Sequence, residues 1–163
     1  EQHDMIVITG GVSAGDFDYL PEVLEELKVE KKFHKVNQRP GRPFWFGIAP
    51  GSKPVFALPG NPVSTLICFH RYVVPWLNRS FGKEAHTGNK AMLTSDYSFS
   101  KPLTCFLQVK DQGFKEGIHQ VIPAMHHGSG DFSSLADTSG FVELKADQDS
   151  FSAGTIVPYF PWL

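Results

Sequence analysis

The stretch GGVSAGDFDYL, residues 10–20, combines three glycines, a serine and two aspartates between an apolar run and a helix-like pattern. Backbone N–H groups of a glycine-rich loop can approach an anion closely, and the start of the following helix adds about half a positive charge. These features predict a phosphate-binding loop, called here the glycine loop (residues 10–15). Its predicted binding residues are Gly10, Gly11, Ser13 and Gly15. An ordinary turn stays open, because Gly, Ser and Asp are also the commonest turn residues.

The two aspartates of this stretch, Asp16 and Asp18, add a second requirement. Carboxylates repel a phosphate unless a divalent cation lies between them. We therefore expect a combined phosphate and metal site, with Asp18 as the main carboxylate and Asp16 as a second candidate ligand of Mg2+. Asp18 also stands where it could cap the helix that follows, and one side chain could serve either need.

The segment FHKVNQRPGRPFWFG, residues 33–47, carries the next group of cations. If residues 33–39 are extended, Lys35, Asn37 and Arg39 fall on one face because side chains alternate with period two. The Pro-Gly turn can bring Arg42 back toward them. In a nearly neutral protein, such a group indicates neutralisation of a polyanion, which arginine can hold through two oxygens at once. A solvated basic strand face is the alternative. The aromatic run FWF fits either a core or a stacking surface.

A second turn that could receive an anion lies in ALPGNPVS, residues 57–64. Two prolines bracket a Gly-Asn pair and deliver the chain into a helix start, with a serine in the first turn. The carboxyl ends of strands are the general ligand site of open α/β sheets. We therefore expect both loops to contribute to one anion-binding site. The residues assigned to the second loop are Pro59, Gly60, Asn61, Pro62 and Ser64.

The elements that would position these loops alternate along residues 1–82. Residues 5–8 predict a buried parallel strand, residues 20–27 predict a helix, and a longer helix follows Pro62. Pro75 is expected to kink or end that second helix. Alternating strands and helices are typical of an α/β layer with a parallel sheet.

The pattern changes after the polar stretch of residues 83–89, which we interpret as a linker. Residues 90–163 hold short alternating runs that are separated by Gly, Ser and Asp turns and show no helical periodicity. Four or five strands at this spacing predict a small all-β barrel or sandwich. The expected fold class is therefore an α/β domain followed by a small all-β, barrel-like domain.

Composition limits the partners of the protein. Fifteen basic and seventeen acidic residues give a net charge of -2, so no overall field favours nucleic acid or a membrane surface. Two cysteines are too few for the disulfide framework of a small secreted domain. No apolar stretch approaches the roughly 18 residues that a membrane helix needs. We therefore expect a cytoplasmic protein without nucleic-acid or membrane partners.

In order and spacing, VITGGVSAGDFDYLPEVLEEL, FHKVNQRPGRPFWFG and VFALPGNPVSTLICFHRYVVPWL resemble the molybdenum-insertase family, MoeA in bacteria and the gephyrin E domain in animals. The match covers nearly all of residues 4–82. It implies part of a three-layer, parallel-sheet domain of the MoCF type, and residues 90–163 resemble the small C-terminal barrel of that family. The resemblance further implies insertion of molybdate into adenylated molybdopterin, a magnesium-dependent step that releases AMP, and a homodimer in the full-length protein.

The resemblance also implies roles for individual residues. Asp18 matches a functional carboxylate and Lys35 a functional lysine, while Arg39 stands where many members have lysine; these three are the expected catalytic residues. Ser129 corresponds to a serine of the barrel that contributes to the site. Gln108 stands where the family often has arginine, which removes a charge from the barrel's expected contribution.

Members of the family carry a further strand-loop-helix half with an S/T-G-D-E motif, and large domains before it. We therefore expect this chain to be the C-terminal part of a longer protein and to be inactive alone. Two other classes remain open. A non-catalytic molybdopterin-binding scaffold would keep the fold without the chemistry, as Gln108 suggests, whereas a MogA-type molybdopterin adenylyltransferase would share the GGxS loop but lack the β domain.

Overall fold

The computed structural model describes residues 3–13, 18–84, 89–124 and 133–162, and the chain divides into two compact units. The N-terminal unit consists of Glu1–Asn37 and Gly41–Phe69, and the C-terminal unit consists of Gln38–Pro40 and His70–Leu163. Three residues from the middle of the first sequence region thus belong to the second unit. The linker predicted at residues 83–89 stays a prediction.

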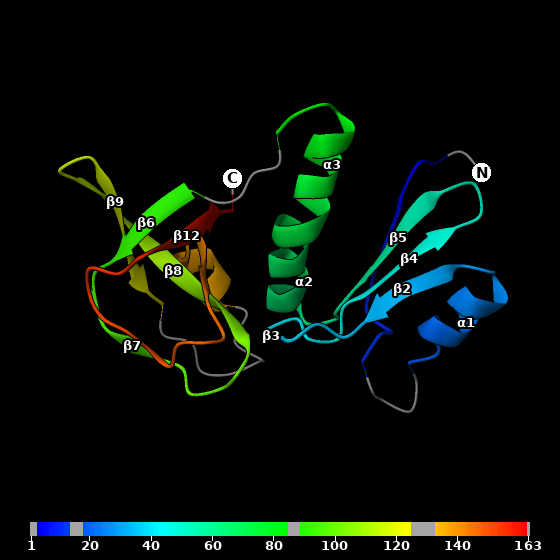
Figure 1. The fold of residues 1–163 in the computed structure, drawn as a ribbon, viewed down its shortest axis with the longest axis horizontal. Helices are drawn as coiled ribbons and strands as arrows, with labels where there is room; N and C mark the ends of the chain where they lie inside the picture. Colours follow the sequence, from blue (N-terminus) through cyan, green and yellow to red (C-terminus); the bar gives the residue numbers. More distant parts are fainter. Residues whose placement is uncertain (1–2, 14–17, 85–88, 125–132, 163) are drawn as a thin grey trace. The chain divides into compact units, whose positions relative to one another are not determined.

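The N-terminal unit is built on one four-stranded sheet, whose strands lie side by side in Figure 1. The strands, in spatial order, are β1 (Ile6–Thr9), β5 (Lys53–Leu58), β4 (Trp45–Ala49) and β2 (Glu30–His34). β1 and β5 are parallel, but β4 pairs antiparallel with both β5 and β2. The α/β class is confirmed; the expected parallel pairing holds for β1 with β5, whereas β4 is antiparallel to both of its neighbours. A tight turn at residues 50–52 joins β4 to β5 and allows only an antiparallel pair.

Strand β1 is less covered than the sequence predicts. Its run of apolar residues indicates a strand buried on both faces, yet Ile6 is 41% exposed and Val7 is 36% exposed. The reason is its position, because β1 is an edge strand and β5 is its one partner among the described residues. The prediction that β1 is parallel is confirmed, and the prediction that it is buried is wrong for this chain.

The first helix, α1, spans Leu20–Glu26 with a proline in its first turn, close to the predicted range. It packs on one face of the sheet, where a buried cluster combines residues of the glycine loop, α1 and the strands. The members of this cluster are Val12, Leu24, Val29, Trp45, Val55 and Ala57. The N-cap position of α1 is assigned to Tyr19, whose own side chain makes no capping hydrogen bond. Whether Asp18 caps α1 or holds a metal ion stays open, as the sequence left it.

The aromatic run of β4 belongs to the core. Phe44 and Trp45 are each 1% exposed, and Phe56 is 4% exposed. The Phe46 and Phe56 rings pack with centroids 4.8 Å apart, on the face of the sheet opposite to Trp45. Of the two interpretations left open by the sequence, core packing is the one that the structure supports.

The second helix begins at Pro62, as the PGNP sequence predicts, and continues through a change of helical type. Its parts are α2 (Pro62–Cys68), a π-helical segment (Phe69–Val73) and α3 (Val74–Ser80). Pro75 lies in the first turn of α3, so it does not end the helix. The missing N–H and the ring of a proline disturb the preceding turn, and the π-helical segment directly before Val74 is a local widening of that kind.

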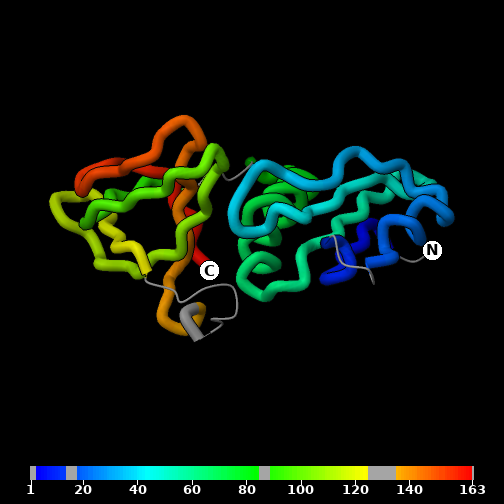
Figure 2. The backbone as a smooth tube through the Cα atoms, turned by 90° about the horizontal axis from the view of Figure 1, so that it is seen from below, coloured from blue at the N-terminus to red at the C-terminus, as the bar shows by residue number. Residues whose placement is uncertain are grey.

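The C-terminal unit contains a closed barrel of five strands, visible as a ring of backbone in Figure 2. Its strands are β6 (Asn89–Leu93), β8 (Thr104–Lys115), β9 (Ile118–Pro123), β10 (Gly140–Leu144) and β12 (Ile156–Pro161). The pairing of β10 with β8 closes the ring, and β6 lies parallel to β9. The predicted barrel-like domain is confirmed.

Smaller elements complete the C-terminal unit. They are β3 (Gln38–Arg39), which adds to β8, the two-stranded sheet of β7 (Tyr97–Ser98) with β11 (Ser150–Phe151), and a 3-10 helix (Ser133–Asp137). Alternate residues of the barrel strands, among them Leu107, Val121 and Leu144, fill its interior. Nowhere in the described part of the chain is a helix both long enough and apolar enough to span a membrane.

Candidate functional site

The two loops singled out in the sequence meet at the carboxyl ends of neighbouring parallel strands. The glycine loop follows β1, and residues 59–62, called here the PGNP turn, follow β5. Gly10 N–H donates to the Leu58 carbonyl at 2.9 Å. A Cβ placed on Gly60 would lie 3.4 Å from the Gly10 Cα, so the two backbones touch through a pair of glycines. The structure thus brings the two predicted loops together.

The described part of the glycine loop, residues 10–13, adopts a backbone that glycine favours. Gly10 and Gly11 have φ values of 86° and 72°, in the left-handed region that side chains make costly. A Cβ on Gly11 would also lie 3.3 Å from the Leu20 Cβ at the start of α1. Val12 is 1% exposed and belongs to the core, while Ser13 is exposed. The core therefore anchors the loop at Val12, and Ser13 faces solvent.

The PGNP turn satisfies most of its own polar groups. Asn61 is the N-cap of α2, and its Oδ1 accepts hydrogen bonds from Ser64 N–H at 3.0 Å and Ser64 Oγ–H at 3.2 Å. The Thr65 hydroxyl donates to the carbonyls of Pro59 and Asn61. These bonds make the turn rigid and aim the Ser64 hydroxyl inward. We infer that the turn shapes the site, and that donors for an anion come mainly from the glycine loop.

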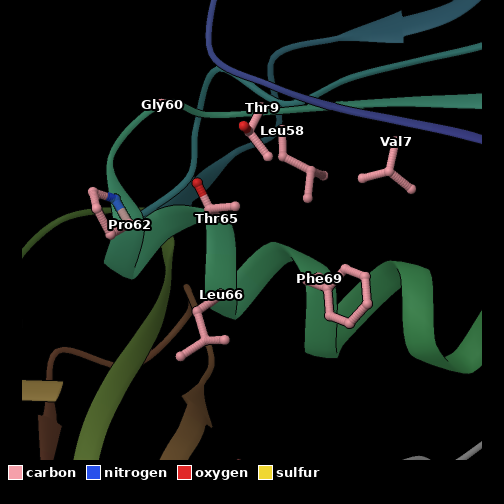
Figure 3. A pocket seen from close by; sticks show the side chains of 8 residues that line it. All are labelled: Val7, Thr9, Leu58, Gly60, Pro62, Thr65, Leu66 and Phe69. Atoms are coloured by element: carbon pink, nitrogen blue, oxygen red, sulfur yellow. The ribbon is translucent and has the colours of Figure 1, made fainter. Parts of the chain in front are cut away.

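An open pocket of about 520 Å³ lies beside this contact, between the ends of β1 and β5 and helix α2. Figure 3 shows Val7 and Phe69 at one end of the pocket, with Gly60, Thr9 and Thr65 toward the other. The remaining lining residues are Leu58, Pro62 and Leu66. The pocket therefore offers an apolar surface that leads to two hydroxyl-bearing residues next to the touching loops.

Lys35 and Arg42 lie near one another at the backbone level, but not through an extended strand. β2 ends at His34, and Lys35 has a left-handed φ of 71°. Lys35 N–H donates to Phe44 O at 2.9 Å, and Val36 N–H donates to Arg42 O at 2.8 Å. The expected return of Arg42 is confirmed at the backbone level. The condition that residues 33–39 form one extended run is not met, because Lys35 has a left-handed backbone directly after β2. Both cationic side chains are exposed.

Arg39, the third predicted cation, belongs to the C-terminal unit, where β3 pairs in parallel with β8 and Arg39 stands opposite Cys105. The joint role of Lys35, Arg39 and Arg42 stays a prediction. Burial raises the pKa of Cys105 to about 11 against the opposing effect of Arg39. Burial, followed by the contact with Cys105, raises the pKa of Tyr97 to about 12. Both groups are neutral at physiological pH, so Cys105 is a poor nucleophile.

The metal prediction rests on few described residues. Asp18 is half-buried and follows the undescribed residues 14–17, which include Gly15 and Asp16. Ser129 likewise lies outside the described residues. Within the described ranges, no group of three or more His, Cys, Asp or Glu side chains could hold a metal ion. One carboxylate still fits Mg2+, which is usually bound by one or two carboxylates together with substrate phosphates and water.

Gln108 lies on β8 and is 4% exposed. Considering only the residues that the structure describes, its amide Nε2 has no hydrogen-bond partner. A buried donor without a partner is costly, by about 1–3 kcal/mol. The main-chain carbonyl of Gln108 accepts from Ala124 N–H at 2.9 Å, so the backbone of β8 at this position pairs with the chain that follows β9. The residue keeps hydrogen-bonding capacity, but it supplies no charge.

His34 is a residue of this region that the sequence analysis did not single out. Its Nε2 lies 2.9 Å from the Val12 carbonyl of the glycine loop. The sequence carries no signal for this contact, because 22 residues separate the two positions and their proximity depends on how β2 and the loop pack on the same sheet. His34 directly precedes Lys35, so it also links the loop to the predicted catalytic lysine.

Comparison with known families identifies the class of protein. Residues 1–79 match the family model described as "Probable molybdopterin binding domain", and residues 90–162 match the one described as "MoeA C-terminal region (domain IV)". The α/β unit with its two touching loops is therefore a molybdopterin-binding type of domain, followed by a MoeA-type barrel.

Individual relatives agree with this class. A molybdopterin molybdenumtransferase from Synechocystis sp. is 41% identical over 162 residues, which are 99% of this chain and 39% of that protein. One from Staphylococcus epidermidis is 37% identical, covering 96% of this chain and 37% of that protein. The crystal structure of a molybdopterin biosynthesis MoeA protein from Pyrococcus horikoshii superposes with a TM-score of 0.78 at 36% identity, over 99% of this chain and 38% of that one. The chain belongs to the MoeA family of molybdopterin molybdenumtransferases, and it spans less than half the length of these relatives.

Proposed function

We propose that this chain is part of an enzyme of molybdenum cofactor biosynthesis that inserts molybdate into adenylated molybdopterin and releases AMP. The observation that carries the proposal is the contact of Gly10 with Gly60 at the carboxyl ends of two parallel strands. The substrate class follows from family membership, since relatives that cover almost the whole chain are named molybdopterin molybdenumtransferase. Because the chain spans 39% of the Synechocystis relative, the activity is proposed for the intact protein that carries this chain.

The glycine loop would bind the phosphate of the pterin substrate through backbone N–H groups. Left-handed Gly10 and Gly11 support this role, because their lack of side chains lets an anion approach the backbone. The PGNP turn would hold the other side of the loop in place through Gly60 and Pro59. The apolar pocket beside it has room for a flat ring. Contacts of Gly15 and Ser129 with the substrate stay predictions, because both residues lie outside the described part of the chain.

The charged residues around the loops would have two roles, binding of a metal ion and stabilisation of negative charge. Asp18, with Asp16 as the second candidate, would hold Mg2+, and the ion would offset the repulsion between carboxylate and phosphate. Lys35 and Arg42 would stabilise the negative charge of molybdate or of the phosphates from the N-terminal unit. The proposed role of Arg39 in offsetting negative charge stays a prediction. Such a site accelerates a reaction by positioning and electrostatic stabilisation rather than by a protein nucleophile.

The state of the full-length protein is part of the proposal. We propose a homodimer in the cytoplasm, which follows from the family resemblance and from the lack of charge features for nucleic acid or membranes. A scaffold without chemistry is the main alternative, and the neutral Gln108 is the observation that favours it. The MogA-type adenylyltransferase is disfavoured, because the chain carries a barrel that those proteins lack.

The testing experiment uses the purified intact protein with adenylated molybdopterin, molybdate and Mg2+, and it measures AMP release under anaerobic conditions. We expect release that depends on Mg2+, and a loss of release with retained pterin binding in Asp18→Asn. The matched control is Asp147→Asn, which alters an exposed aspartate of the barrel unit and should leave release unchanged. Pterin binding without AMP release in the unaltered protein would support the scaffold and reject the enzyme.

A further inference from the structure

We propose that His34 is a positioning residue that fixes the glycine loop and Lys35 in their binding arrangement. The inference rests on the proposed function for its ligand, but its structural part stands on this chain alone. His34 is the last residue of β2 and pairs with Trp45 on the sheet face that carries the core cluster of Val12 and α1. Its ring is half-buried, and its Nε2 lies 2.9 Å from the Val12 carbonyl.

The chemistry of the contact fixes the ring's proton. A carbonyl oxygen can only accept, so Nε2 must carry the hydrogen. The bond is therefore present in the Nε2–H tautomer of the neutral ring and in the charged ring, and it is absent from the Nδ1–H tautomer. The contact holds the loop whether or not the ring is protonated.

The contact completes a set of three restraints on the loop. At its start, Gly10 N–H is held by Leu58 O at 2.9 Å, and in its middle the Val12 side chain is buried in the core. His34 holds the Val12 carbonyl. Two peptide N–H groups, those of Gly11 and Val12, lie between the two hydrogen bonds along the chain. These groups are the donors that we propose for the phosphate.

The second consequence concerns Lys35. Its backbone is left-handed, with a φ of 71°, directly after the residue whose ring contacts the loop. A side chain that fixes the last position of β2 therefore also fixes where Lys35 leaves the strand. Preorganised donors and charges bind a ligand more tightly, because less ordering remains to be done on binding.

A pair of amide substitutions tests the role. In His34→Gln the amide nitrogen stands as many bonds from Cβ as Nε2 does in histidine, whereas in His34→Asn it stands one bond closer, at the position of Nδ1. In His34→Asn we expect the amide hydrogen of Gly10 to exchange with solvent about tenfold faster than in the unaltered protein. In the intact protein, the same variant should bind molybdopterin about tenfold more weakly. We expect His34→Gln to stay within about threefold of the unaltered protein in both measurements. The control is His119→Gln, which removes the ring that contacts Asp111 in the barrel unit and should change neither value.

Two outcomes overturn the proposal: His34→Asn leaves the Gly10 exchange rate unchanged, or His34→Gln and His34→Asn accelerate it equally. A measurement without any substitution gives a further check, since nitrogen NMR of the ring must show the hydrogen on Nε2, and a neutral Nδ1–H tautomer would refute the contact. If the unaltered intact protein binds no molybdopterin, the proposed function fails, while the exchange rates and the tautomer still decide the role of His34.

Discussion

Substitutions of Asn61 distinguish two effects of the PGNP turn: its contribution to the stability of the fold and its proposed position close to a bound anion. The side-chain oxygen of Asn61 accepts from the backbone N–H and the hydroxyl of Ser64, and Ser64 is 7% exposed. Asn61→Ala and Asn61→Asp both remove the amide N–H groups, but only aspartate keeps an oxygen for these two bonds. The comparison between the two variants therefore isolates the acceptor and its charge.

The structure predicts opposite orders for stability and for binding. Loss of an N-cap acceptor costs about 0.5–2 kcal/mol, and the burial of Ser64 places this site in the upper half of that range. Asn61→Asp should therefore have a free energy of unfolding about 1–2 kcal/mol larger than that of Asn61→Ala. For the ligand, a carboxylate roughly 10 Å from a phosphate at an effective dielectric of about 20 costs about 1.7 kcal/mol before screening. Asn61→Asp should bind molybdopterin about tenfold more weakly than Asn61→Ala.

The assay combines urea unfolding of both variants with an anaerobic titration by molybdopterin, followed by tryptophan fluorescence. Raising the salt concentration should reduce the difference in affinity between the variants, because it screens an exposed charge. The reasoning is refuted if the more stable variant also binds more tightly. That result would mean that the turn contributes only through its rigidity and that no anion lies near it.

Two further perturbations test other parts of the account. Gly11→Ala and Gly82→Ala both place alanine at a φ of 72°, which costs about 1–2 kcal/mol of unfolding free energy. A Cβ at Gly11 would also lie 3.3 Å from the Leu20 Cβ, whereas one at Gly82 meets nothing within 4 Å, so Gly11→Ala should lose at least as much stability. Only Gly11→Ala should also weaken molybdopterin binding, because Gly11 belongs to the proposed phosphate loop and Gly82 does not. Equal affinity of the two variants would contradict a role for the loop. Cys105 and Tyr97 have ordinary pKa values of 9.0 and 10.0, which burial raises to about 11 and about 12 in the folded protein. The unfolded chain therefore loses these protons first, so stability should be complete below pH 9 and fall as the pH rises through 11 and 12. Urea unfolding at pH 8 and pH 11 measures this fall, and Tyr97→Phe should make it smaller; an unchanged fall would place its cause elsewhere.

Local sequence signals predicted the parts of the fold that depend on neighbouring residues. The PGNP sequence predicted the start of α2, because proline suits the first helical turn. Alternating runs predicted the barrel strands, since side chains of a strand alternate between interior and surface. The glycine-rich sequence predicted a loop after β1, and in the structure Gly10 and Gly11 lie in that loop with a left-handed backbone.

Other parts depended on contacts between distant segments, which local signals do not specify. Lys35 has a left-handed φ although it is not glycine, so its residue type did not predict that β2 ends before it. Arg39 joins the barrel sheet through a pairing with β8, some 65 residues away in the chain. The exposure of Val7 depends on which strands flank β1, and the contact of His34 with the loop depends on the packing of β2.

The most direct test of the central claim is the position of the pterin phosphate in a crystal structure of the intact protein with bound molybdopterin. We predict that the phosphate lies within about 3.2 Å of backbone nitrogens in residues 10–13, with Gly60 in contact with Gly10 as it is without ligand. A phosphate bound elsewhere, with residues 10–13 free of the ligand, would contradict the account.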